Sequence, residues 1–126
     1  HRLLADEPTD VGGDGSGPTP YDLLSAALGA CTSMTLRLYA EHKKFDVGRI
    51  SVEVSHSKTH AEDSSDSAAE RKREVSRFDR TIFVEGEPGE DIRKRLLAIA
   101  DRCPVHRTLS ESNVITTRFG GSRGER

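Results

Sequence analysis

The longest run of apolar and small residues in the chain covers positions 23–36. Just before this run, Thr19, Pro20 and Asp22 form a Thr-x-x-acid capping box with proline at the first helical position, which is typical of a helix start. The pattern therefore predicts a helix that begins at Pro20 and ends at about Lys44. Apolar or small side chains lie on every side of this helix over most of its length, so we expect it to be buried all round.

Alternation of apolar and polar residues, which indicates a strand with one exposed face, occurs at 48–57 and again at 78–86. We expect these two segments to pair as antiparallel strands. The residues between them, 58–77, show no period and are rich in charge and serine, which is typical of a long, mobile connection. Two further segments are interpreted as strands: 2–5 as an edge strand or the end of a strand that begins upstream, and 113–119 as the closing strand.

The remaining segments are helical or irregular. Apolar residues at helical spacing predict a second helix over 91–102, and a proline starts a short third helix over 104–109. The glycine- and proline-rich segment 6–20 is a loop, and it lacks the Lys-Ser/Thr ending of a phosphate-binding loop. Strands and helices mix without regular alternation, so we expect an α+β fold with a single domain over 1–120 and a disordered tail at 121–126.

Composition narrows the class of protein. The chain has 126 residues, of which 33% are hydrophobic and 32% are charged. The low apolar content favours a domain that hides part of its core in a dimer, or one that carries a solvated insertion. The net charge of −2 and the basic clusters at 70–74 and 93–95, which acids interrupt or flank, argue against nucleic-acid binding.

The expected compartment follows from what the sequence carries. No apolar run reaches the about 20 residues that a membrane span needs, and no signal peptide is visible. Two cysteines in such a chain favour a reducing compartment, so we expect the protein in the cytoplasm. In that setting, a cysteine pair is more often catalytic, redox-active or metal-binding than a structural disulfide.

The two cysteines have different local settings. Cys103 comes directly before the helix expected at 104–109, whose start favours a thiolate, and His106 and Arg107 could add positive charge within the next turn. Cys31 lies in the middle of an apolar helix, which raises the pKa of a thiol unless a cation approaches it from elsewhere in the chain.

Four interpretations of the pair are open on composition and spacing. The thiols could be small apolar packing groups, or they could form a redox pair in which one is oxidised and the other captures it. A structural disulfide is disfavoured by the compartment. A metal site of Cys31, Cys103 and His106 has ligand-like spacing in "CPVH", but no second pair of ligands completes it.

A resemblance decides between them. The segment "GPTPYDLLSAALGACTSMTL" (17–36), followed some seventy residues later by "CPVHRTL" (103–109), resembles the OsmC/Ohr family of osmotically inducible and organic-hydroperoxide-resistance proteins. The Gly-rich loop, the Pro-initiated helix with its cysteine and the later Cys-Pro match in order and spacing. The likeness covers about residues 3–119, and it is greatest to the OsmC-like branch of the family.

The resemblance implies an intertwined homodimer in which a long buried central helix packs on antiparallel strands, with active sites at the interface. It also implies a thiol peroxidase that reduces organic hydroperoxides. Cys31 would be the peroxidatic nucleophile and Cys103 the resolving thiol. The family needs no flavin, haem or metal, and an external dithiol, a lipoylated protein in the family, would re-reduce the enzyme.

The sequence departs from the family at two supporting positions. Family members place an Arg beside the reactive cysteine, from a hairpin that would precede this sequence, so the cation is expected from another residue such as Arg107. A Glu follows the helix-initiating Pro in the family, and here that position is Tyr21, with Asp22 next. Asp22 lies nine residues from Cys31, on the opposite face of the helix at about 100° per residue, which favours a capping role. These departures motivate an alternative: a non-enzymatic dimer that binds a small apolar ligand at its interface.

Overall fold

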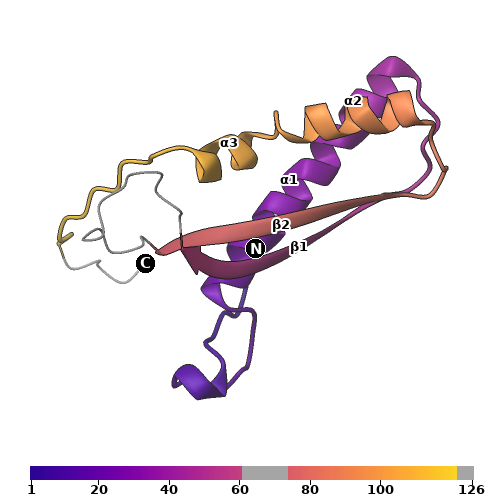
Figure 1. Cartoon of the computed structure of the whole chain (residues 1–126). Helices are drawn as coiled ribbons and strands as arrows, with labels where there is room; N and C mark the ends of the chain where they lie inside the picture. The colour runs from indigo at the N-terminus through magenta and orange to yellow at the C-terminus, as the bar shows by residue number, and fades with distance from the viewer. Residues whose placement is uncertain (61–73, 122–126) are drawn as a thin grey trace.

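The computed structural model describes residues 1–60 and 74–121, and it confirms an α+β architecture (Figure 1). In chain order the elements are the 3₁₀ helix η1 (Thr9–Val11), α1 (Pro20–Lys43), β1 (Ile50–His60), β2 (Glu74–Val84), α2 (Glu90–Ala100) and α3 (Pro104–Ser110). No helix among the described residues is long and apolar enough to cross a membrane.

Helix α1 begins and ends where the sequence indicates. The Thr19 hydroxyl accepts a hydrogen bond from the Asp22 amide at 3.1 Å, and the Asp22 carboxylate accepts one from the Thr19 amide at 3.0 Å. The predicted capping box is therefore confirmed. At the other end, Lys44 takes a left-handed conformation with φ of 57°, which lets the Ala40 carbonyl accept from the Phe45 amide at 2.8 Å.

The two strands form an antiparallel hairpin, as predicted, but they are longer than the sequence indicates. The register runs from Ile50 opposite Val84 to His60 opposite Glu74. Residues 58–60 and 74–77 therefore pair in the ladder, and the prediction that all of 58–77 is a connection is wrong at both ends. The rest of that segment, 61–73, lies outside the described residues.

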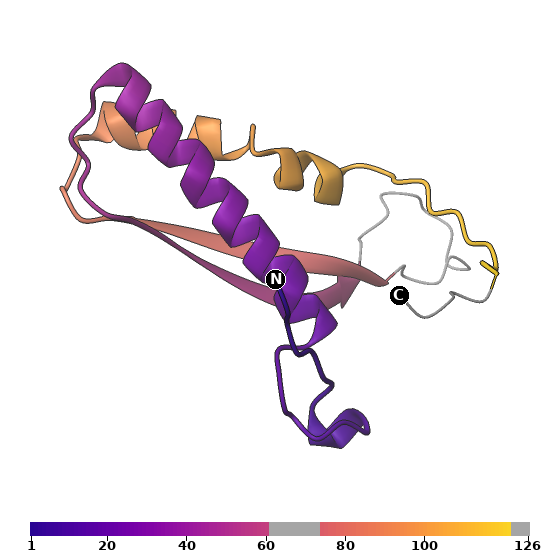
Figure 2. The same ribbon diagram turned by 180° about the vertical axis from the view of Figure 1, so that it is seen from behind.

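The hairpin and the helices pack into layers around α1. In Figures 1 and 2, α2 and α3 follow one another along one side of the hairpin, and α1 runs obliquely across the hairpin with its C-terminal end beside α2. Gly29 lies where α1 meets β1, and a Cβ added there would be 3.4 Å from the Val54 side chain, so the two backbones approach closely. The buried core lies where the end of α1 meets α2, and it consists of Leu36, Ala40, Val47, Leu96 and Ala100.

The expected burial of α1 on all sides is wrong for the single chain. One stripe of the helix is buried against the hairpin, α2 and α3, and its residues are Ser25, Leu28, Thr32, Leu36 and Ala40. A second stripe is apolar but open to solvent: the side chains of Met34 and Leu38 are 65% and 68% exposed, and Leu24 is also exposed. The sequence cannot distinguish a face that the chain covers itself from one that another chain would cover.

Both outer strands predicted from the sequence are wrong in the described chain. Residues 2–5 and 113–119 carry no strand, because the sheet in the described part of the chain consists only of β1 and β2. A strand needs a neighbour for its backbone hydrogen bonds, and these apolar segments have none beside them. Val114 and Ile115 are almost fully exposed as a result. Most of the tail predicted at 121–126 lies outside the described residues.

The loop predicted at 6–20 is confirmed and is organised by one side chain. The Asp6 carboxylate accepts hydrogen bonds from the amides of Glu7, Asp14 and Ser16 at 2.9, 3.0 and 3.1 Å, and from the Ser16 hydroxyl at 2.8 Å. These bonds, led by the one from the Ser16 amide, lower the pKa of Asp6 to about 2. The loop is therefore ordered by hydrogen bonding to a charged group.

Candidate active site

The two cysteines belong to different elements. Cys31 lies in the middle of α1 and is partly exposed, whereas Cys103 is the N-cap residue of α3 and is fully buried. The Cys103 amide donates to the Ala100 carbonyl at 3.2 Å, and its carbonyl accepts from the Arg107 amide at 3.1 Å. The turn between α2 and α3 therefore fixes the backbone of Cys103 from both sides.

The structure brings the two cysteines together. Both are unbridged, and each thiol lies close enough to the other to shift its pKa. The Val105 amide, in the first turn of α3, also donates toward both sulfur atoms. Seventy-two positions apart in the numbering (31 to 103), the two thiols meet because α3 packs on α1.

The surroundings change the acidity of the two thiols in opposite directions. Burial raises the pKa of Cys31, and its hydrogen bond to Cys103 raises it further. Burial alone would also raise the pKa of Cys103. There it is outweighed by hydrogen bonds from the Cys31 thiol, the His106 amide and the Thr32 hydroxyl, so that the pKa of Cys103 is lowered. Cys103 is therefore the more acidic thiol of the pair.

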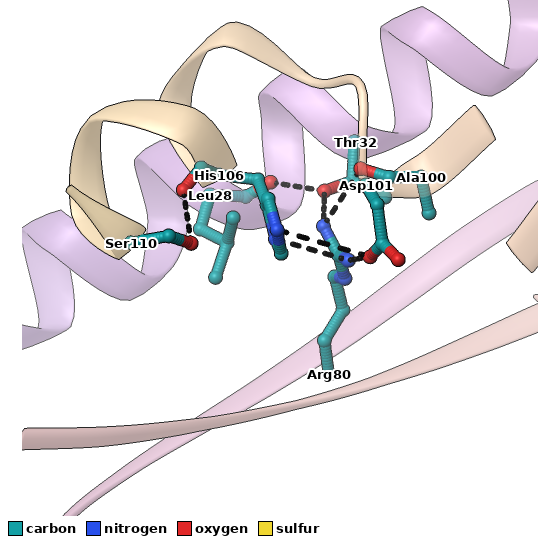
Figure 3. A network of polar contacts seen from close by, with 7 residues as sticks. All are labelled: Leu28, Thr32, Arg80, Ala100, Asp101, His106 and Ser110. Carbon is teal, nitrogen blue, oxygen red and sulfur yellow. Dashed lines mark hydrogen bonds and ion pairs between the residues drawn. The ribbon is translucent and has the colours of Figure 1, made fainter. Parts of the chain in front are cut away.

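An arginine from the hairpin completes the polar surroundings (Figure 3). The Arg80 side chain, only 12% exposed, reaches from β2 toward the junction of α1 and α2. Its Nη1 donates to Thr32 Oγ1 at 3.0 Å and to the Ala100 carbonyl at 3.2 Å, and its Nη2 donates to Asp101 Oδ1 at 3.0 Å. Nη2 also lies 3.4 Å from Nδ1 of His106. One side chain thus joins the hairpin to all three helices.

Of the supporting residues predicted from sequence, His106 lies in this network. Besides its approach to Arg80, its Nε2 is 3.9 Å from Asp101 Oδ1. Its backbone amide also donates to Cys103. The Arg107 side chain is exposed. This residue bonds to Cys103 through its backbone amide, which donates to the Cys103 carbonyl. The prediction that Arg107 supplies the cation therefore gains no support from the structure.

Tyr21 and Asp22 lie at the start of α1, apart from the thiols. Ten and nine residues separate them from Cys31, or about 15 and 13 Å along the helix axis. Asp22 serves the capping box, as its position on the helix predicts. The Tyr21 ring stacks on His56 of β1 with ring centroids 4.3 Å apart, and so it packs the helix onto the hairpin.

Sequence reasoning missed Arg80 and Thr32, although each carries a local signal. Arg80 occupies the same face of β2 as Phe78 and Ile82, so it is a charged residue at a position where the alternation calls for an apolar one. Thr32 is a polar residue within the buried stripe of α1. A polar group on an apolar face requires a partner, and these two residues partner each other.

A pocket adjoins this network. It has a volume of about 440 Å³ and lies between α1, β2 and α3. Its lining combines apolar side chains with the edge of the polar network, and the residues are Leu28, Ser76, Phe78, Arg80, His106, Leu109 and Ser110. Among the described residues, no group of three His, Cys, Asp or Glu side chains could hold a metal ion. The pocket, which neither cysteine lines, therefore suits a small molecule with an apolar part.

Fold and site together define a class: an α+β protein in which a long central helix and a short helix bring two reduced thiols into contact. The sequence profile of the OsmC-like protein family matches residues 13–118. The chain belongs to the OsmC-like family.

Solved structures show the same fold. A protein from Psychrobacter arcticus, whose name refers to osmotic stress induction and a detoxification response, superposes with a TM-score of 0.66 at 23% identity, covering 86% of this chain and 72% of the other. An organic hydroperoxide resistance protein OsmC from Legionella pneumophila gives 0.65 at 21% identity, with 86% and 73% covered. An OsmC-like protein from Mycoplasma pneumoniae gives 0.64 at 21% identity, with 87% and 73% covered. A search of curated proteins gave no match.

Proposed function

We propose that this protein is a thiol-dependent peroxidase that reduces organic hydroperoxides to alcohols through Cys31 and Cys103. The observation that carries the proposal is the proximity of two free thiols from distant parts of the chain, each of which shifts the pKa of the other, with the pKa of Cys103 lowered. Membership of the OsmC-like family and the likeness to a protein named for organic hydroperoxide resistance support it.

Access assigns the first step to Cys31, since Cys103 is fully buried. The Cys31 sulfur attacks the terminal oxygen of the hydroperoxide as its proton passes to the Cys103 thiolate. The O–O bond breaks, Cys31 becomes a sulfenic acid, and the alkoxide takes a proton to leave as an alcohol. In this step Cys103 acts as the base of a nucleophile–base pair.

The second step closes the disulfide. The Cys103 thiol gives its proton to the departing alkoxide, and the thiolate that remains attacks the Cys31 sulfur. The S–OH bond breaks, and hydroxide leaves as water after protonation. The two sulfur atoms have then supplied the two electrons that reduced the O–O bond. A lowered pKa makes Cys103 suited to this step, and also to leaving when a reductant attacks Cys31.

The proposal includes an external dithiol, such as a lipoylated protein, as the reductant. It also includes a homodimer in the cytoplasm. The exposed apolar stripe of α1 supports the dimer, because a second chain could cover Leu24, Met34 and Leu38. Cys31 lies beside this stripe on the helix, so a partner chain would also shelter the thiol.

Turnover tests the proposal directly. With dihydrolipoamide as the reductant, we expect the protein to consume cumene hydroperoxide, and Cys31→Ser to reduce the rate to background. Ser33→Ala, which alters a partly exposed residue of the same helix, should keep the rate and serves as the matched control. Equal rates for the wild type and Cys31→Ser would contradict the proposal. If they were accompanied by saturable binding of a fatty acid, they would favour a ligand-binding dimer.

A further inference from the structure

Arg80 is a largely buried cation that contacts Thr32, the residue next to Cys31 in the chain. A guanidinium in an interior needs several partners, and Arg80 has them from three directions: Thr32, the Ala100 carbonyl and Asp101. Asp101 is mostly exposed, so water weakens its hold on the positive charge. The contact with Thr32 lies on the buried side, toward the cysteines.

Thr32 stands between Arg80 and Cys103. Its side chain is fully buried, its Oγ1 accepts from Arg80, and its one hydroxyl proton points to the Leu28 carbonyl at 2.7 Å. The same hydroxyl is one of the groups that lower the pKa of Cys103. While Cys103 is a neutral thiol, the Thr32 hydroxyl donates its hydrogen bond to the Leu28 carbonyl. A Cys103 thiolate is a stronger acceptor than that carbonyl, so the hydroxyl turns to donate to the sulfur instead.

Arg80 strengthens the hydrogen bond that the Thr32 hydroxyl donates to the Cys103 thiolate. A donor on the hydroxyl oxygen polarises the O–H bond, so the hydroxyl becomes a better donor to a third group. The geometry points to Arg80 as a positioning residue of the active site that, through the Thr32 hydroxyl, holds Cys103 in the thiolate form. This inference rests on the proposed function, because it names what sustains the base and resolving roles of Cys103.

Three other charged or titratable groups near Cys103 also affect the stability of its thiolate. The Cys31 thiol on α1 lowers the pKa of Cys103. Asp101 and His106, from the turn after α2 and from α3, contact Arg80 itself. A protonated His106 would add positive charge near the thiolate, and Asp101 would oppose it. The test therefore varies Arg80 and Thr32 alone, at fixed ionic strength.

The experiment measures the ultraviolet absorbance of the thiolate against pH in a Cys31→Ser background, where Cys103 is the one remaining thiol. We expect Arg80→Met to move the midpoint upward by about one pH unit. Thr32→Val should move it upward as well, and Thr32→Ser, which keeps the hydroxyl, should restore it. Arg77→Met is the matched control: Arg77 lies on the same strand, pairs with Asp79 and is exposed, so the midpoint should not move.

The double variant separates action through Thr32 from action through space. If Arg80 works through the hydroxyl, adding Arg80→Met to Thr32→Val should shift the midpoint little further. An equal shift in both backgrounds would overturn the inference. So would an unchanged midpoint in an Arg80→Met protein whose circular dichroism is that of the parent.

The readout is independent of peroxidase activity. A midpoint that shifts as expected in a protein without hydroperoxide turnover would refute the proposed function and leave the role of Arg80 intact. Hydroperoxide turnover in a protein whose thiolate midpoint does not shift in Arg80→Met would refute the role of Arg80 and leave the proposed function intact.

Discussion

Cys31 and Cys103 touch each other, yet their surroundings differ in almost every respect. Cys31 lies on a helix, beside an exposed apolar stripe, and burial raises its pKa. Cys103 is enclosed, and amide, hydroxyl and thiol donors lower its pKa. Access and acidity are thus divided between two sulfur atoms. Under the proposed mechanism, a partly exposed thiol with an unfavourable pKa reacts because a buried neighbour takes its proton.

The largest expected effect of breaking this division is on the product of oxidation. After one equivalent of cumene hydroperoxide, Cys103→Ser should carry a sulfenic acid on Cys31 that dimedone traps, because no second thiol captures it. Cys31→Ser should give no trapped adduct, since its remaining thiol is buried. Peptide mapping by mass spectrometry locates the adduct on Cys31 or Cys103 and distinguishes it from oxidation of Met34. A dimedone adduct on Cys103 would contradict the proposal, because it would make Cys103 the peroxidatic thiol and Cys31 the resolving thiol.

The two stripes of α1 extend the comparison from the thiols to the helix that carries one of them. Leu36→Ala, in the buried core, should lower the free energy of unfolding by about 2–5 kcal/mol, which urea denaturation measures. Leu38→Ala, on the exposed stripe, should cost far less in a single chain. If a second copy covers this stripe, Leu38→Ala should instead increase dissociation in analytical ultracentrifugation. A monomeric wild type at micromolar concentration would contradict the dimer.

The pH dependence of oxidation sharpens the comparison further. In the wild type, the pair loses its first proton below the ordinary thiol value of 9.0, because the pKa of Cys103 is lowered. In Cys103→Ser, the burial that raises the pKa of Cys31 remains, but the neighbouring thiolate that would take its proton is absent. The single-turnover rate should therefore rise with pH at a lower midpoint in the wild type than in this variant. Equal midpoints would show that Cys31 ionises without help from Cys103.

The smallest expected effect is in the N-terminal loop, far from the thiols. The folded pKa of Asp6 is about 2 against an ordinary value of 3.8, so its contribution to loop order is complete above pH 3.8 and is lost as the pH falls toward 2. Asp6→Asn should remove this dependence while leaving thiol chemistry unchanged. Amide exchange of Asp14 and Ser16 measures it. If neither the fall in pH nor Asp6→Asn changes the amide exchange, the Asp6 carboxylate does not order the loop.

The sequence predicted the elements whose signals are local. The capping box of α1, the hairpin and the short helix after Cys103 all follow from neighbouring residues. It mispredicted 2–5 and 113–119, where apolar residues are present but a pairing partner is absent from the described chain. A strand depends on a neighbour that its own sequence does not contain.

The candidate site divides in the same way. Both cysteines were identified from their motifs, but the Arg80–Thr32 contact joins residues 48 positions apart and was found only in three dimensions. Arg107 was favoured as the cation because it is close in sequence to Cys103. On a helix, the next residues turn away from the cap, and the Arg107 side chain points to solvent.

The central claim is that the two sulfur atoms exchange electrons with an oxidant as a pair. Intact-mass spectrometry and peptide mapping after stoichiometric cumene hydroperoxide test it most directly. The account predicts the loss of two hydrogen masses per chain and a peptide that links Cys31 to Cys103 within one chain. Thiols that stay fully reduced, or that oxidise separately without forming this link, would contradict it.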